Sequence, residues 1–186
     1  MADVMSMLRH DHGNFAVLLN IVERQVNVFI AGGAADYRIL RDSLDYFLDY
    51  PGLRHHPLED LVYDRLIQRR PDMAEAVDDL VAGHKVLADK ARDFSEAIDR
   101  VLAEEEVPRD WLAARAKAFV DGYRIHLEAE ERRFFPAAEA ALDEDDWRQI
   151  NGAAADAVDP LFGATVMDRF QALHRGIRAQ EEDLPG

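Results

Sequence analysis

Apolar residues recur at three- and four-residue spacing along almost the whole chain, and no segment alternates apolar and polar residues as a strand would. This period gathers the apolar side chains on one face of a helix and leaves the polar ones on the other. The first stretch shows the pattern clearly, through Leu8, Phe15, Leu19, Val22 and Val26. The spacing therefore predicts an all-α protein.

Four long helices are predicted from the points at which glycine and proline interrupt this pattern. They cover about residues 4–30, 36–66, 72–104 and 108–135. We expect a kink or a short irregular turn at Pro51 and Gly52, inside the second helix. Pro108 suits the first turn of the fourth helix, which Pro136 should kink or end. Short connections between long amphipathic helices favour an up-down-up-down four-helix bundle.

A shorter helical pattern follows residue 142. Asp143 is a suitable N-cap for a helix over residues 146–150, and a last helix is predicted over about residues 160–179. We therefore expect residues 1–142 to form the bundle and residues 143–186 to form a C-terminal helical extension packed on it.

Composition and charge exclude several classes of site and partner. The chain has no cysteine, which excludes disulfides, thiolate metal sites and cysteine-ligated iron–sulfur clusters. Its formal net charge of -15 at pH 7 opposes binding to nucleic acid or to an anionic membrane surface. No apolar stretch is long enough to cross a bilayer and no secretory signal is recognisable, so we expect a cytoplasmic protein. A buried metal would need histidine, glutamate or aspartate as ligands.

Four of the seven histidines occupy positions where the helical pattern calls for an apolar residue: His12, His55, His84 and His126. A buried imidazole needs a polar partner, because an unsatisfied polar group inside a bundle costs on the order of several kcal/mol. Together the four histidines indicate a shared polar site inside the bundle.

Two of these histidines are followed by a glutamate at position i+4, His55 by Glu59 and His126 by Glu130. Positions i and i+4 share a helix face, so each pair can bind one metal, or one metal and a bridge to a second. All six side chains lie at similar heights when distances from the predicted turns are counted at about 1.5 Å per residue. Because glycine and proline located the turns, this agreement supports one shared metal site.

Neighbouring polar residues leave alternatives open. His56 forms a half-exposed pair with Asp60 near the Pro57 kink, supports the site, or replaces His55 as a ligand in a different register. Asp11 and Glu131 are more simply explained as solvent-facing or ligand-orienting residues than as ligands. His10 is expected at the surface.

The combined pattern resembles the hemerythrin-like family of HHE cation-binding proteins, in its variant H…HxxxE…H…HxxxE. The strings LRHDHGNF, HHPLEDLVYDRL and HLEAEERRFFP are similar to the family's first, second and fourth helix motifs, and the resemblance covers roughly residues 5–140. It implies a non-haem centre of two iron ions with a bridging oxide or water, while zinc or manganese also suit these ligands. The resemblance implies that Glu59 and Glu130 bridge the two metals. It also implies that His12 and His55 bind one metal and that His84 and His126 bind the other.

The chain departs from the oxygen-carrying hemerythrins at two places. Those proteins have a second histidine one turn after the first in the third helix, where this chain has Ala88. They also end with a five-residue step from histidine to aspartate, where this chain has HxxxE. The resemblance therefore implies fewer imidazoles on one iron and more room there for water or an exogenous ligand.

Three functions remain open from the sequence. The first is reversible binding or sensing of a small ligand such as dioxygen, peroxide or nitric oxide, or of iron itself. The second is enzymatic turnover of peroxide or nitric oxide, and the third is metal storage or a structural zinc or manganese site. No nucleophile triad, phosphate-binding loop or nucleotide fingerprint supports a hydrolase or a kinase. The sequence identifies no protein partner.

Overall fold

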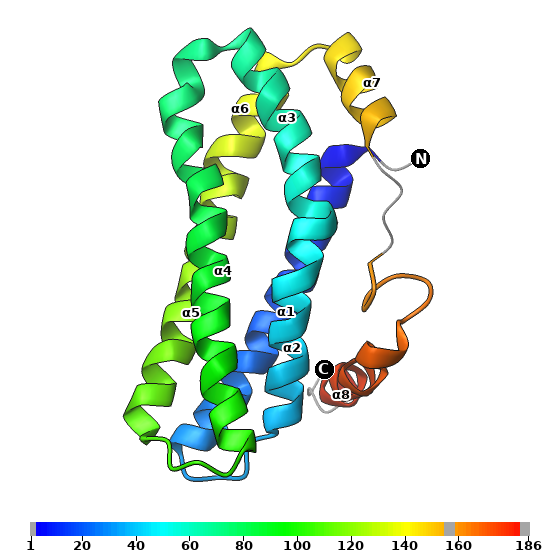
Figure 1. Cartoon of the computed structure of the whole chain (residues 1–186). Coiled ribbons are helices and arrows are strands. Elements are labelled where there is room, and N and C mark those ends of the chain that lie inside the picture. Colours follow the sequence, from blue (N-terminus) through cyan, green and yellow to red (C-terminus); the bar gives the residue numbers. More distant parts are fainter. Residues whose placement is uncertain (1–2, 155–158, 183–186) are drawn as a thin grey trace.

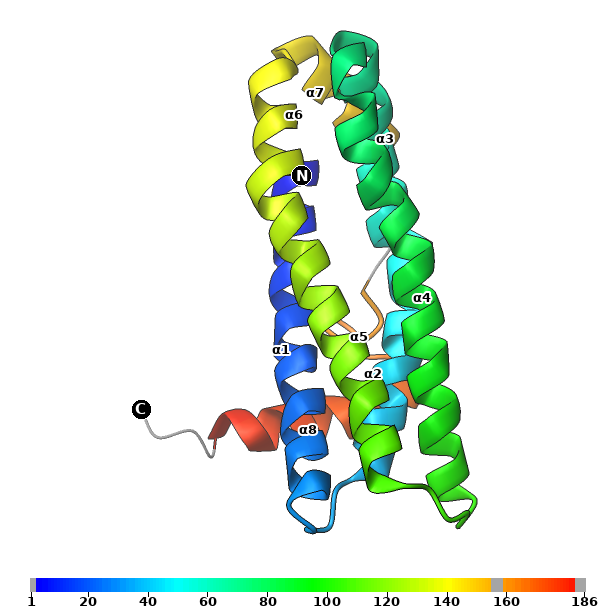
Figure 2. The same cartoon turned by 90° about the vertical axis from the view of Figure 1, so that its left-hand side faces the viewer.

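Four antiparallel helical rods form the protein (Figures 1 and 2). The computed structural model describes residues 3–154 and 159–182, and their side chains except those of residues 75–78, 81 and 179–182. The rods are α1 (Val4–Ile30), α2 (Tyr37–Tyr50) with α3 (His56–Arg69), α4 (Ala74–Leu102), and α5 (Arg109–Ala129) with α6 (Phe135–Ala141). No strand occurs among the described residues. The predicted all-α, up-down-up-down four-helix bundle is confirmed.

The apolar core is divided into two clusters by a polar layer. α1 packs against α2 and α5, and α4 packs against the same two helices. The apolar stripes of all four rods therefore meet on the bundle axis. On α1, Leu8 belongs to one cluster and Phe15 to the other, with His12 between them. The other three rods change cluster at the same level. No helix in the described ranges is long and apolar enough to cross a membrane.

α1 and α4 end with the same left-handed turn, which satisfies carbonyl groups that a helix leaves unpaired. After α1, Gly32 has a φ of 80° and its N–H donates to the carbonyl of Phe29 at 3.0 Å. After α4, Glu104 holds the equivalent position with a φ of 59°, and its N–H donates to the carbonyl of Val101 at 3.0 Å. A residue with a Cβ is sterically disfavoured there, and a carboxylate at the negative end of a helix dipole adds repulsion.

A π-helical turn joins the two helices of each composite rod, over Pro51–His55 and over Glu130–Phe134. Each turn ends two residues before a proline, Pro57 or Pro136. In a regular α-helix the proline ring would clash with the carbonyl four residues earlier, and the proline would leave that carbonyl without a donor. We attribute the wider π turn to this clash, since it moves the carbonyl away from the ring.

The structure corrects three details of the predicted helices. The interruption at Pro51 and Gly52 is an ordered π turn within a continuous rod, not an irregular segment. The fourth rod continues through Pro136 to Ala141 because the π turn accommodates the proline. Pro108 is the N-cap of α5, with extended backbone at ψ 131°, so it precedes the first turn instead of lying in it.

Asp143 caps the next helix, α7 (Glu144–Ala153), as predicted, and forms a capping box with Asp146. α7 packs against α3. Arg69 of α3 donates to the carboxylates of Asp143 and Asp146, each at 2.8 Å. These ion pairs hold α7 beside the upper end of the bundle in Figure 1.

The last helix begins later than predicted. The segment from Asp159 to Met167 forms turns and bends, and α8 (Gln171–Glu182) follows a short 3-10 turn at Asp168–Phe170. The Asp159 carboxylate accepts the N–H groups of Leu161 and Phe162, so this aspartate caps a turn that does not extend into a helix. α8 lies across the bundle axis and packs against α2 (Figure 2). The division of the chain at residue 142 stays a prediction.

Replacing Glu104 by glycine should raise the free energy of unfolding by about 1 kcal/mol, because glycine adopts the left-handed conformation without steric cost. Urea denaturation of the metal-free protein would measure the change. Glu106→Gly is the matched control, since Glu106 follows the turn without a positive φ and its replacement should not stabilise the protein. A Glu104→Gly variant no more stable than the parent would contradict this account of the turn.

Candidate metal centre

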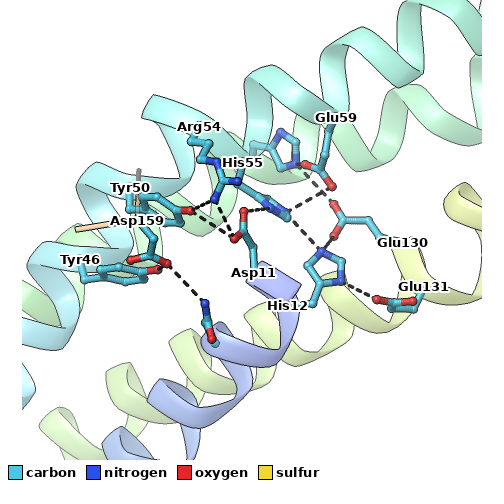
Figure 3. Close-up of polar contacts among 12 residues, drawn as sticks. Asp11, His12, Tyr46, Tyr50, Arg54, His55, Glu59, Glu130, Glu131 and Asp159 are labelled. Atoms are coloured by element: carbon cyan, nitrogen blue, oxygen red, sulfur yellow. Dashed lines mark hydrogen bonds and ion pairs between the residues drawn. The ribbon is translucent and has the colours of Figure 1, made fainter. Parts of the chain in front are cut away.

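The six predicted ligands come from all four rods and meet in the polar layer between the two apolar clusters. α1 and α4 supply one histidine each, and each composite rod supplies one HxxxE pair, with His55 in the first π turn and Glu130 in the second. Figure 3 shows His12, His55, Glu59 and Glu130 converging on the interior. The helical counting that placed these residues at one height is therefore consistent with the structure.

Each glutamate lies between imidazoles of different rods. The Glu59 carboxylate is 3.4 Å from Nε2 of His55 and 3.3 Å from Nε2 of His84. The Glu130 carboxylate is 3.3 Å from Nε2 of His12 and 3.5 Å from Nε2 of His84. Both carboxylates thus have the position of a bridge between the two halves of the cluster.

Three groups of ligand atoms in the described part of the chain could each hold a cation, and two of these groups together contain all six predicted ligands. His126 is 2.7 Å from Glu130 through Nε2, and its ligand atoms group with those of His84 and Glu130. The other group consists of His12, His55, Glu59 and Glu130, whose ligand atoms all lie within 4.8 Å of one another. This division agrees with the arrangement implied by the resemblance. The identity of the individual ligands stays a prediction.

Several buried atoms of this cluster have no hydrogen-bond partner in the described part of the chain. They are both carboxylate oxygens of Glu59, Oε2 of Glu130 and Nε2 of His84. The nearest nitrogens lie 3.3 to 3.5 Å away without hydrogen-bond alignment. Glu59 and Glu130 are only 3% and 1% exposed, so bulk solvent does not reach their carboxylates. Buried carboxylates and imidazoles without partners suit bound cations, which would satisfy all of these atoms at once.

The pKa values also reflect the close packing of these groups. Burial by itself would lower the pKa of His55, but Glu59 and Asp11 outweigh burial and raise it to about 10. Burial is likewise outweighed at His84, whose pKa is raised to about 9 by Glu130 and Glu59. Burial would raise the pKa of Glu59 and Glu130, but the neighbouring imidazoles hold both below the usual value. Without metal, the imidazoles of His55 and His84 are therefore positively charged at neutral pH.

A second layer of carboxylates contacts the imidazoles from outside. The Nδ1 of His12 donates to Glu131 at 2.9 Å, and the Nδ1 of His55 donates to Asp11 at 3.4 Å. The sequence left Asp11 and Glu131 as either solvent-facing or ligand-orienting, and both contact an imidazole. It gave no sign of Tyr50 and Arg54, which donate to Asp11 at 3.2 and 3.3 Å, because this contact depends on the π turn that follows Tyr50 and contains Arg54 and His55.

His56 lies beside the six predicted ligands, and its ligand atom also groups with those of Glu59 and His84, so His56 stays a candidate ligand. Its ring stacks on that of His84 with centroids 3.8 Å apart and planes inclined by 9°. Burial and the nearby His84 lower the pKa of His56 to about 3, so the ring is uncharged at neutral pH and can stack on a charged neighbour. His55 is the residue that faces Asp11 and Glu59. His10 is exposed, as expected.

Cation binding should release protons, because His55 and His84 must lose theirs to become ligands. We expect release of about two protons per chain at pH 7, and an apparent affinity that rises with pH up to about 10, where His55 loses its proton. Calorimetric titration with Zn²⁺ in buffers of different ionisation enthalpy would count the protons. Heats of binding that are independent of the buffer would contradict the protonated state of the two imidazoles.

Comparison with known proteins agrees with this geometry. The family model described as hemerythrin HHE cation binding domain matches residues 3–138, and a second, overlapping match covers residues 76–182. The first match includes all four rods up to Ala138 and all six clustered side chains. No curated protein and no solved structure matches the chain. The chain belongs to the hemerythrin HHE cation-binding domain family.

Proposed function

We propose that this protein binds two iron ions through His12, His55, Glu59, His84, His126 and Glu130, and that the pair of ions binds or senses a small ligand such as dioxygen, peroxide or nitric oxide. The observation that carries the proposal is the pair of buried glutamates, each within 3.5 Å of imidazoles from two other elements, with three of their four carboxylate oxygens lacking a hydrogen-bond partner in the described part of the chain.

The donor set favours iron over the alternatives. It contains only imidazole and carboxylate groups, and the chain has no thiolate to offer. Mixed imidazole and carboxylate ligation with free coordination positions is typical of non-haem iron that meets dioxygen or related molecules. When bound, such an iron pair supplies one-electron chemistry and Lewis acidity, while Glu59 and Glu130 offset the charge of the two ions in a dry interior.

A small cavity beside the His84 half supports a ligand of a few atoms. It has a volume of about 10 Å³ and is lined by Glu59, Asp60, Tyr63, Leu80, His84, Glu130 and Phe134. A space of this size holds about one water molecule. Leu80 and Phe134 supply apolar walls, and Glu59, His84 and Glu130 beside them give the cavity direct access to a bound cation. This geometry favours diatomic ligands and peroxide over organic substrates.

Metal analysis tests the proposal directly. Protein made in iron-replete cells should contain about two iron ions per chain, and Glu59→Ala or Glu130→Ala should lower the content below one, because each variant removes a shared bridge. His10→Ala is the control, since His10 is exposed and outside the cluster. Equal iron content in all three variants would defeat the assignment of the ligands.

Optical spectra separate the remaining functions. Bridged ferric pairs absorb in the near-ultraviolet and visible range, whereas a zinc site is silent there. A stable, reversible spectral change on adding dioxygen or nitric oxide supports binding or sensing. Sustained loss of added peroxide supports an enzyme instead. A colourless protein that keeps zinc or manganese under iron-replete conditions would establish a structural or storage role.

Leu80→Ala should enlarge the cavity and admit azide. The variant should bind azide at least tenfold more tightly than the parent protein, because removing steric exclusion from an apolar pocket contributes about 1–3 kcal/mol to binding. Azide titration of the iron-loaded protein, followed by its charge-transfer absorption, measures the effect. Leu142→Ala is the matched control, since both leucines are 7% exposed in the same apolar cluster and Leu142 does not line the cavity. Equal azide affinity in the parent and both variants would remove the cavity from the proposal.

A further inference from the structure

The two halves of the cluster carry nearly the same ligands in nearly the same order. Each half has one histidine on a single helix and an HxxxE pair on a composite rod. His12 precedes His55 by 43 residues, and His84 precedes His126 by 42. With ligands this similar, groups outside the ligand set can make the two halves differ in cation affinity.

Such a difference lies behind the first pair of imidazoles. Glu131 holds the Nδ1 of His12 at 2.9 Å, and Asp11 holds the Nδ1 of His55 at 3.4 Å. A carboxylate bonded to Nδ1–H fixes the tautomer that leaves Nε2 free for a metal, and makes that nitrogen a stronger donor. Both Nε2 atoms point into the cluster, where they lie 3.2 Å apart (Figure 3).

Asp11 is itself held in place. It is fully buried, and it accepts from the hydroxyl of Tyr50 at 3.2 Å and from Arg54 at 3.3 Å. Arg54 also donates to the Tyr50 hydroxyl at 2.6 Å, which closes a triangle of contacts around the carboxylate (Figure 3). The guanidinium compensates the charge of Asp11, so the carboxylate can remain ionised in the interior and orient His55.

The second pair of imidazoles has no such support. In the described ranges no carboxylate bonds to the Nδ1 of His84 or of His126. The Nδ1 of His126 instead lies against Gly83, 3.1 Å from the point where a Cβ would stand. The side chains of His84 and His126 are 14% and 10% exposed, compared with 6% for His12 and 3% for His55.

The second half also meets the surface. A groove of about 360 Å³ between α4 and α5 is lined by Gly83, Val86, Gly122, Ile125 and His126, among other residues. His126 thus belongs both to the cluster and to the wall of an open groove, which gives cations a route to and from this half.

We infer that Asp11 and Glu131 are positioning residues that make the two halves unequal: the His12/His55 half binds its cation first and tightly, and the His84/His126 half binds second and exchanges. The inference rests on the proposed two-metal site. It assigns the exchangeable position to the half beside the small cavity, where an exogenous ligand would bind.

Titration of the metal-free protein with Co²⁺ under anaerobic conditions tests the inference, because cobalt binding is followed by its visible absorption and by competition with a chelator. The parent protein should bind two ions with affinities that differ by at least tenfold. Asp11→Asn and Glu131→Gln should each weaken the first event by about 10–100-fold, the usual effect of losing such a support, and leave the second within threefold. Each should also change the cobalt spectrum of the first event.

Two carboxylates serve as matched controls. Asp159 is buried and accepts from a tyrosine hydroxyl, as Asp11 does, but contacts no imidazole, so Asp159→Asn should leave both events unchanged. Glu139 pairs with Arg9, as Glu131 does, without reaching His12, so Glu139→Gln should behave like the parent. Gly83→Ala should weaken only the second event, because its Cβ presses on His126.

Three outcomes would overturn the inference: two events of equal affinity in the parent, equal weakening of both events by Asp11→Asn and Glu131→Gln, or the same weakening by the control variants. Glu131 is partly exposed, so Glu131→Gln gives a folded test even if Asp11→Asn does not fold. Binding of no cobalt, or of only one ion per parent chain, would instead refute the two-metal site itself.

Discussion

Two carboxylates held together inside an apolar bundle are the constraint on which the rest of this structure depends. Glu59 and Glu130 present oxygens within 4.8 Å of one another at a level where the apolar core is interrupted. Such a pair repels itself, and burial removes the water that would screen it. Protonated imidazoles relieve the repulsion in part, and two cations would relieve it fully. The polar layer thus lowers stability on its own, and its position is reasonable only for a protein that binds metal.

The scaffold concentrates its irregularities near this layer. Each π turn contains one residue of an HxxxE pair, since His55 ends the first turn and Glu130 begins the second. The regular parts of the rods fill the two apolar clusters, which hold the bundle together above and below the site. The regular helical segments therefore stabilise the bundle, and the segments near the π turns place the ligands. The outer carboxylates Asp11 and Glu131 link the surrounding helices to the ligands, since they hydrogen-bond His55 and His12.

The sequence predicted the fold and the level of the site because both follow from spacing. Glycine and proline located the ends of the helices, and histidine on an apolar stripe located the polar layer. Spacing could not predict contacts that depend on how one rod is rotated against another, such as Glu131 with His12 or His56 stacked on His84. It also failed before α8, where Asp159 caps a turn in a stretch whose apolar residues repeat as in a helix.

The π turns have a consequence for how members of this family are compared. A π turn contains one residue more than the α-helical turn it replaces, and one residue corresponds to about 100° of rotation about the helix axis. Deleting a single residue within 51–54 would keep the HxxxE string intact and yet turn both of its side chains away from the bundle axis. A relative that retains all six motif letters but is one residue shorter there would lack the centre. Loops usually tolerate insertions and deletions, but this segment does not. Its length is constrained as strictly as the identity of the ligand residues.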